Sequence, residues 1–264
     1  MLRLLRRDPS IGEIAYFDIS HAGETYRIKL KRVAAARRFT LRVRAGTHEV
    51  VLTMPTRGSL AEAKSFAGRN AAWIGARLRR LPAKIGLLPG DCVPLRGVLH
   101  QIAHRAVGRG TIWIEPAPRG AEDAGQGGAL PLICVNAEAS FIPRRVQDYL
   151  IREARRDLEG AVARHSKAIG VAPRKMTLRD TASRWGSCSS TGALSFSWRL
   201  IMAPQFVLDY LAAHEVAHLK YMNHSAAFWA AVESLSSEVE AAEAWLKANG
   251  ASLLRFGPGK ASAG

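Results

Sequence analysis

A His-Glu-x-x-His segment in the later part of the 264-residue sequence has residue types that could hydrolyse an amide bond. It contains His214, Glu215 and His218. On a helix, residues four apart lie on the same face, so both imidazoles can reach one metal ion. Glu215 lies about 100° round the helix axis from His214, where its carboxylate can reach a water molecule at the metal without binding the metal. The metal lowers the pKa of that water and Glu215 can take its proton, so the segment predicts metal-assisted hydrolysis.

A catalytic zinc site needs a third protein ligand. His224 follows His218 by six residues, which is the offset of the third histidine in the extended metzincin motif. In that motif a Gly lets the chain turn, but Tyr221 takes its position here, so we expect the helix to end near Met222 and Asn223 to turn the chain. His224 is the preferred third ligand. The alternative is a carboxylate from a later helix, and the candidates are Glu233, Glu238 and Glu240.

The other histidines lack such companions. His100 and His104 have the same spacing, but Gln101 stands where the base should be. Their segment alternates like a strand, in which residues four apart lie about 13 Å from each other. We interpret these two as ordinary histidines, together with His21, His48 and His165.

The composition limits the class of protein. Hydrophobic residues make up 48% and charged residues 23%, as in globular proteins, and no stretch approaches the roughly 18 apolar residues of a membrane-spanning helix. The N-terminus is basic without the apolar core of a signal peptide. Cys92, Cys134 and Cys188 are too few and too scattered for a disulfide framework or a zinc ribbon. We therefore expect a cytoplasmic protein with reduced thiols and no membrane contact.

The formal net charge of +16 raises the question of a nucleic-acid partner. Most of the basic residues are Arg, and they are spread along the chain rather than gathered in one segment. They are accompanied by neither an aromatic-basic RNA motif nor a zinc-finger pattern. Nucleic acid stays an open partner that charge alone supports, and the oligomeric state stays undetermined.

The first part of the chain predicts a β-rich structure. Apolar and polar residues alternate within residues 24–55, the period changes to that of a helix at about 59–81, and a strand-rich stretch follows over 92–114. We therefore predict a β-rich N-terminal part over residues 1–115 with one helix. Residues 116–131 are rich in Gly, Pro and Ala, and predict an exposed loop.

The second part predicts helices around paired strands. The expected elements are a strand at 132–135, a helix at about 143–169 that ends at Gly170, paired strands over 176–200, a helix from Pro204 and a helix over 228–249. We predict a catalytic part over residues 132–255 and a flexible tail over 256–264. The His-Glu-x-x-His segment lies on the helix that begins at Pro204.

Several short motifs together resemble the YgjP-like metallopeptidase family, which is related to the SprT-like zinc proteases. The segment HEVAHLKYMNHSAAFW follows RWGSC at residues 184–188, WRL at 198–200 and the pair Ala203-Pro204. AAWI at 71–74 and WLK at 245–247 fit the same layout. The resemblance covers about residues 25 to 255, and RWGSC combined with NHSAAFW is its most specific part.

The resemblance implies a zincin-like fold with a zinc ion. The residues that match the three histidine ligands of the family are His214, His218 and His224, and Glu215 matches its catalytic glutamate. Related SprT-like proteases include members that act on proteins bound to DNA. The resemblance therefore implies a reaction class more directly than it implies a substrate.

Other residues near the motif have two interpretations each. Arg184 and Trp185 could line the cleft, but we favour a structural role in bracing the strand pair. Cys188 could be a nucleophile, but no histidine is left to activate it, so we expect an inert thiol. Tyr221 could stabilise an oxyanion. The strand at 193–200 could bind an extended substrate by edge pairing. Phe228 and Trp229 are expected in the core.

These observations predict an α+β protein in which a zincin-like metallopeptidase domain follows a β-rich N-terminal part. The predicted activity is that of a zinc metallopeptidase which cleaves a protein or peptide substrate, with Glu215 as general base and then as acid towards the leaving amine. Two alternatives remain. One is a nucleic-acid-associated binding protein with a structural zinc site, although such sites normally have four ligands and are rich in Cys. The other is a zinc hydrolase that acts on a non-peptide amide.

Overall fold

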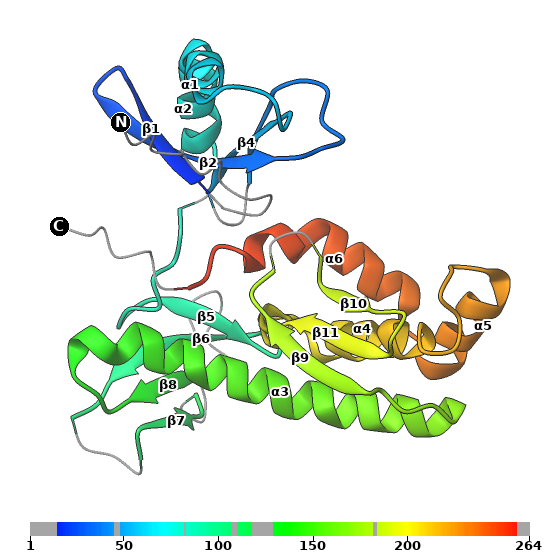
Figure 1. Cartoon of the computed structure of the whole chain (residues 1–264). Coiled ribbons are helices and arrows are strands. Elements are labelled where there is room, and N and C mark those ends of the chain that lie inside the picture. Colours follow the sequence, from blue (N-terminus) through cyan, green and yellow to red (C-terminus); the bar gives the residue numbers. More distant parts are fainter. Residues whose placement is uncertain are drawn as a thin grey trace, which may run out of the picture. The chain divides into compact units, whose positions relative to one another are not determined.

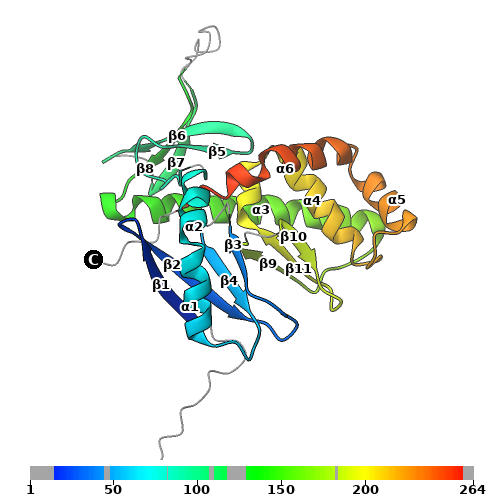
Figure 2. The same ribbon diagram turned by 90° about the horizontal axis from the view of Figure 1, so that it is seen from above.

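The chain folds into two compact units, Met1–Pro82 and Ala83–Gly264, each with its own hydrophobic core. The structure is a computed structural model (Figures 1 and 2). It describes residues 15–44, 48–81, 83–106, 110–117, 129–181 and 184–257. Residues 118–128 of the predicted exposed loop and residues 258–264 of the predicted tail lie outside the described residues. No helix in the described ranges is long and apolar enough to span a membrane.

The first unit is a four-stranded sheet with two helices along one face (Figure 2). In chain order its strands are β1 (Ala15–His21), β2 (Glu24–Arg32), β3 (Thr40–Val43) and β4 (Val50–Met54). Their order in the sheet is β1-β2-β4-β3, with β2 and β4 parallel and the other pairs antiparallel. Ile28 and Leu52 point from the sheet into the core, where Ile74 of the second helix meets them.

The helical region expected at about 59–81 is divided into α1 (Leu60–Arg69) and α2 (Ala71–Arg79). Ser59 begins α1 with a capping box, since its hydroxyl accepts from the backbone N–H of Glu62 and the Glu62 carboxylate accepts from the backbone N–H of Ser59. Asn70 divides the helices. Its φ of −103° and ψ of 10° lie outside the helical region, so the hydrogen-bond ladder stops and restarts there.

The second unit contains a four-stranded sheet formed by β5 (Cys92–Leu95), β6 (Val98–His104), β7 (Ile112–Glu115) and β8 (Leu132–Val135). Its order is β5-β6-β8-β7, and β6 is parallel to β8. The division expected at residue 115 therefore differs from that of the structure, which groups residues 83–115 with the later chain. The reason is the pairing of β6 with β8, a contact between segments that are distant in the sequence.

A second sheet in this unit has the order β10-β11-β9, from β9 (Lys175–Arg179), β10 (Gly186–Cys188) and β11 (Ala193–Ser197). The helices are α3 (Ile142–Ile169), α4 (Gln205–Ala217), α5 (Ala226–Leu235) and α6 (Val239–Leu253), with short 3-10 turns η2 (Ala139–Phe141) and η3 (Trp198–Met202). α3 packs against both sheets and α4 (Figure 1). This mixed α and β architecture with an N-terminal sheet agrees with the predicted α+β class.

Two predicted helix boundaries can be compared directly with the structure. α3 ends at Gly170 as predicted, in the left-handed conformation (φ 67°) that lets its N–H bond back to the last carbonyls of the helix. The single helix predicted over 228–249 is wrong, because Ser236 is extended (φ −141°, ψ 125°) and separates α5 from α6. The break lets α6 return across α4.

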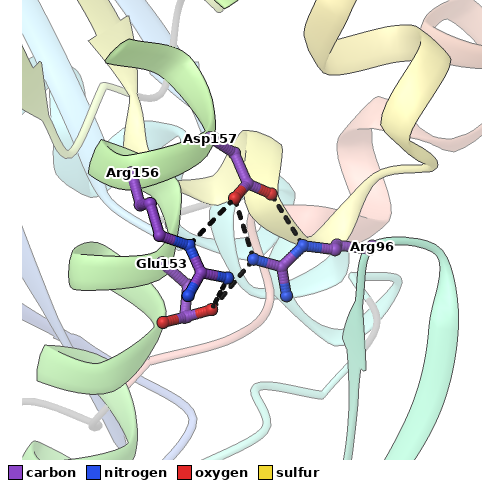
Figure 3. Close-up of polar contacts among 4 residues, drawn as sticks. All are labelled: Arg96, Glu153, Arg156 and Asp157. Atoms are coloured by element: carbon purple, nitrogen blue, oxygen red, sulfur yellow. Dashed lines mark hydrogen bonds and ion pairs between the residues drawn. The ribbon is translucent and has the colours of Figure 1, made fainter. Parts of the chain in front are cut away.

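The turn between β5 and β6 contacts the residues that precede α4, the helix on which the His-Glu-x-x-His segment lies. The N–H of Arg96 donates to the carbonyl of Ile201 at 2.7 Å. Its guanidinium pairs with Asp157 at 2.7 Å and with Glu153 at 2.9 Å on α3 (Figure 3). A Cβ at Gly97 would lie 3.0 Å from Pro204, so only glycine lets this turn approach the residue before α4 so closely. The turn thereby ties α3, η3 and α4 together.

Candidate metal centre

α4 brings two of the predicted site histidines onto one face. His214 lies in its last turn and His218 is the residue that caps it, with the N–H of His218 donating to the carbonyl of His214 at 3.3 Å. Their ring centroids are 5.0 Å apart. Most residues of α4 are buried, because the helix lies between α3, α6 and the β10–β11 hairpin. The helix spacing read from the sequence therefore places both imidazoles at the same end of a buried helix.

The chain after α4 returns His224 to the same place. Nε2 of His224 lies 3.4 Å from Nε2 of His214, and the ring of His224 lies 4.8 Å from that of His218. One nitrogen from each of the three histidines lies within 4.8 Å of the others. Among the described residues this is the one grouping of three or more metal-binding side chains, so the structure does not bring the alternative carboxylates of Glu233, Glu238 and Glu240 to it.

The route of this return differs from the expectation. The helix ends at Ala217 rather than near Met222, and a turn closes when the N–H of Tyr221 donates to the carbonyl of Ala217 at 2.9 Å. Asn223 does not have positive φ. Because the helix ends early, five residues separate His218 from His224 in a non-helical path, and no left-handed residue is needed. This explains why Tyr221 can stand where metzincins have Gly.

Two hydrogen bonds orient the imidazoles. Nδ1 of His218 lies 3.0 Å from the carbonyl oxygen of Tyr221, which can only accept, so Nδ1 carries the proton and Nε2 keeps its lone pair. The hydroxyl of Tyr210 donates to Glu243 at 2.7 Å and lies 3.4 Å from Nδ1 of His214. Its oxygen can accept from that nitrogen, which again leaves Nε2 free. The pattern, in which an outer hydrogen bond sets the tautomer, is that of metal-binding histidines.

Tyr210 and Glu243 are functional candidates that the motif did not reveal. The available signal was local, since Tyr210 precedes His214 by four residues and so shares its helix face. Glu243 lies on α6 and meets Tyr210 only through the tertiary fold. Burial, then hydrogen bonding to Glu243, raises the pKa of Tyr210, so its hydroxyl stays protonated and can donate.

The surroundings of His214 and His218 favour the neutral form of both imidazoles. Burial, followed by the neighbouring His218 and His224, lowers the pKa of His214 to about 4. Burial is also the main cause that lowers the pKa of His218. Neutral imidazoles keep the lone pair that metal binding requires. The donor set of three imidazole nitrogens suits a zinc ion, for which imidazole is a preferred ligand.

Glu215 lies beside the histidines in a buried position, with 5% of its surface exposed. Its Oε2 atom has no hydrogen-bond partner among the described residues. Burial raises the pKa of Glu215 to about 7, while the charge of Arg184 acts in the opposite direction. A carboxyl group with this pKa can both accept and release a proton near neutral pH.

The strand β10 covers Glu215, and this explains the Gly of the RWGSC motif. A Cβ at Gly186 would lie 2.7 Å from Cγ of Glu215, closer than real Cβ contacts come. Trp185 packs against Gly250 of α6, with 3.1 Å between its ring and the position of a Cβ there. This contact supports the structural role expected for Trp185. Arg184, in contrast, is exposed and acts on Glu215 through its charge.

Two aromatic side chains of α5 stack on the imidazoles of the cluster. Ser225 begins α5 with its hydroxyl accepting from the N–H of Phe228. The fully buried ring of Phe228 stacks on His218 with centroids 4.4 Å apart, and Trp229 stacks on His224 at 5.8 Å. The NHSAAFW segment thus contains one histidine, the helix cap and the two rings that support the imidazoles.

The remaining sequence candidates lie outside the cluster. Sγ of Cys188 donates to the carbonyl of Ser189 at 3.4 Å, and burial raises its pKa, so the thiol stays protonated. His100 is on β6, with Nδ1 2.8 Å from the carbonyl of Val98, and His165 pairs with Asp209. The expected edge pairing at 193–200 is wrong, because β11 is the middle strand of its sheet and both its edges are already paired.

One of the comparisons with known proteins identifies the family of this chain. The YgjP-like metallopeptidase domain matches residues 37–249. No curated protein matches the chain. Among solved structures, the crystal structure of the metallopeptidase zymogen of Pyrococcus abyssi abylysin is similar, with 21% identity over 34% of this chain and 93% of that one and a TM-score of 0.30. Because the domain match spans most of the sequence, this chain belongs to the YgjP-like metallopeptidase family.

Proposed function

We propose that this protein is a zinc-dependent peptidase of the His-Glu-x-x-His type. The observation that carries the proposal is the convergence of three imidazole nitrogens next to the buried carboxyl group of Glu215, whose Oε2 atom lacks a hydrogen-bond partner among the described residues. A buried, unpaired carboxylate is costly to the fold, so its presence beside a metal-binding set favours a role in proton transfer.

In the proposed mechanism His214, His218 and His224 hold the ion. A bound zinc ion would supply a Lewis acid that lowers the pKa of a water molecule and polarises the peptide carbonyl. Glu215 would act as the general base that accepts a proton from the attacking water, and then as the general acid that passes this proton to the leaving amine. Its pKa of about 7 suits both steps, because a general acid and base works best when its pKa lies near the working pH.

The fold supports a zincin-like catalytic part within the second unit. The supporting features are a buried helix that carries two of the histidines, a return of the chain that brings the third, and a strand that lies over the glutamate. The substrate is proposed to be a protein or peptide in extended form. β10 is an edge strand of its sheet and contacts Glu215, so a chain that pairs with its free edge would pass the candidate site.

The test measures bound zinc and proteolysis of an unfolded protein by the native chain, Glu215→Gln and His218→Ala. Glu215→Gln should keep zinc and lose at least about a hundredfold in rate, because general acid–base catalysis contributes that much or more. His218→Ala should lose both. Glu233→Gln is the matched control, since it removes an exposed carboxylate outside the cluster. Native activity in Glu215→Gln would contradict the mechanism, and zinc without any activity in the native chain would favour a structural metal site.

A further inference from the structure

A cavity of about 530 Å³ lies on the face of the β9–β10–β11 sheet that points away from the core. On β9, Met176 packs against the core, so Lys175, Thr177 and Arg179 project to the opposite face and line the cavity. The lining also includes Gly186, the residue that contacts Glu215. The Cβ position of Gly186 faces Glu215 on the core-facing side of β10, so this edge strand lies between the cavity and the candidate metal centre.

Hydroxyl groups form a row across this face. Ser187 of β10 is paired in register with Ser195 of β11, which in turn is paired with Thr177 of β9. Cations flank the row, with Lys175 and Arg179 at the two ends of β9, about 13 Å apart along the strand. The third cation, Arg184, precedes β10. The hydroxyl of Thr177 donates to the carbonyl of Leu194 at 3.3 Å, so the donors that remain for a ligand are the hydroxyls of Ser187 and Ser195. Hydroxyl donors between cations form a surface suited to carboxylates.

The positive charge of the cavity is not balanced by the protein. No carboxylate lines the cavity, and within the described residues none of the three cations forms a salt bridge. Asp180, the residue after β9, pairs instead with the buried Arg199 at 2.8 Å. A concave surface with uncompensated charge of one sign attracts ligands of the opposite sign.

The surroundings of the cavity favour an acidic peptide over nucleic acid as the negatively charged ligand. Binding of single-stranded nucleic acid relies on aromatic faces on which bases stack. The one aromatic residue of the lining, Trp185, has its ring packed against Gly250. An extended chain paired with the free edge of β10 would direct alternate side chains to the hydroxyl-bearing face.

We propose that this cavity is a substrate subsite for acidic side chains, which makes the protein prefer peptide segments with Asp or Glu near the bond that is cleaved. The proposal deepens the proposed peptidase function and rests on it for cleavage, whereas the binding preference is measurable separately. The test replaces Lys175 and Arg179 and leaves Arg184 in place. Arg184 also acts on Glu215, so its replacement would alter the pKa of Glu215 as well as the binding preference.

The experiment measures binding of two labelled peptides of roughly ten residues by fluorescence anisotropy, one alternating Glu and Ala and one alternating Gln and Ala. The proteins are the native chain, Lys175→Gln/Arg179→Gln, and the control Arg174→Gln/Arg145→Gln, which removes equal charge at exposed positions outside the cavity. The native chain should prefer the Glu peptide. In the cavity variant, the ratio of the affinities for the Glu and Gln peptides should fall about fivefold for each cation removed, the upper range for exposed ion pairs. The control should keep the native ratio. Added salt should reduce the preference.

The swapped variant Lys175→Arg/Arg179→Lys should regain the preference, which shows that its loss does not come from misfolding. Sequencing the products of a peptide library should show Asp or Glu enriched near the bonds cleaved by the native chain and by the control, but not by the cavity variant. If peptides bind with this preference and none is cleaved, the subsite stands and the peptidase function fails. Equal binding of both peptides, or equal loss in the control, overturns the subsite. It is also overturned if a short single-stranded oligonucleotide binds through Lys175 and Arg179 while the Glu peptide does not.

Discussion

At the scale of single residues, the candidate centre depends on residues that position Glu215 and His214. Gly186 leaves the space that Glu215 occupies, and Tyr210 connects His214 to Glu243. Neither Gly186 nor Tyr210 would bind the metal or the reacting atoms in the proposed mechanism. Both therefore allow tests in which metal binding and activity respond differently.

Gly186→Ala should reduce activity by about ten- to a hundredfold while zinc stays bound. The added methyl would lie 2.7 Å from Cγ of Glu215, so the carboxylate must move, and small misplacements of a catalytic group are costly. The measurement is kcat/KM together with zinc content. Gly160→Ala on α3 is the control, because a Cβ there meets only the end of the Arg164 side chain at 3.6 Å. Unchanged activity in Gly186→Ala would show that the position of Glu215 under β10 does not matter.

Tyr210→Phe should weaken zinc affinity by about ten- to a hundredfold, the usual cost of losing the outer hydrogen bond of a metal ligand. The hydroxyl no longer orients His214, and Glu243 loses its donor. Competition with a chelator measures the affinity. Tyr221→Phe serves as the control because its backbone carbonyl, which accepts from His218, is retained. A Tyr210→Phe protein that binds zinc like the native chain would exclude this role.

At the scale of elements, α3 and α4 are joined by a small charged cluster. Asp209 on α4 accepts from Arg164 at 2.8 Å and lies 3.1 Å from Nε2 of His165, both on α3. Burial tends to raise the pKa of Asp209, but the hydrogen bond and charge of His165, together with those of Arg164, outweigh it and the pKa is lowered. The cluster thus contributes to the packing of the helix that carries His214.

The pH dependence of stability follows from that lowered pKa. A carboxyl group whose pKa is lower in the folded state stabilises the fold at pH values above its unfolded pKa of about 3.9, and the contribution disappears as the pH falls through the folded value. The free energy of unfolding of the native protein should therefore exceed that of Asp209→Asn by about 1 kcal/mol at pH 7. The difference should disappear below about pH 4. Urea unfolding from pH 7 to pH 3 measures it. A gap that widens on acidification would contradict the assignment.

At the scale of the whole molecule, the two units have separate cores. Among the described residues, the larger core begins at Ile85 and includes the buried face of α4, while the smaller core ends at Leu78. The strands β5, β6 and β7, which the sequence pattern grouped with the N-terminal strands, lie in the larger unit together with β8. Arg96, in the turn between β5 and β6, bonds to η3 through its backbone N–H and to α3 through its guanidinium (Figure 3). The three-histidine cluster therefore draws its support from residues 83–257.

A chain that begins at Ala83 should fold and bind zinc with the affinity of the full chain, because the larger core, as far as the chain is described, is made of residues from 85 onward. A chain that begins at Leu132 should not, because it lacks β6, the partner of β8, and the Arg96 turn. Thermal unfolding and zinc titration of both chains measure this. If the shorter chain behaved like the longer one, the expected division near residue 132 would describe the catalytic part better.

The sequence by itself determined the features that depend on neighbouring residues. Helix periodicity placed His214 and His218 on one face, the Gly at position 170 ended α3, alternation predicted β6, and the strand pattern at 176–200 predicted β9. These follow from backbone geometry over a few residues, which the residue types reveal directly. The YgjP-like resemblance, also drawn from local motifs, was confirmed by the domain match over residues 37–249.

The tertiary structure decided what depends on residues distant in the chain. The pairing of β6 with β8 assigned residues 83–115 to the second unit, and the sheet order placed β11 in the middle and β10 at the edge. The contact of Gly186 with Glu215 and that of Glu243 with Tyr210 also join separate elements. Such contacts are selected by the packing of the whole core, because many pairings satisfy the same local pattern, and only one of them buries all the apolar faces together.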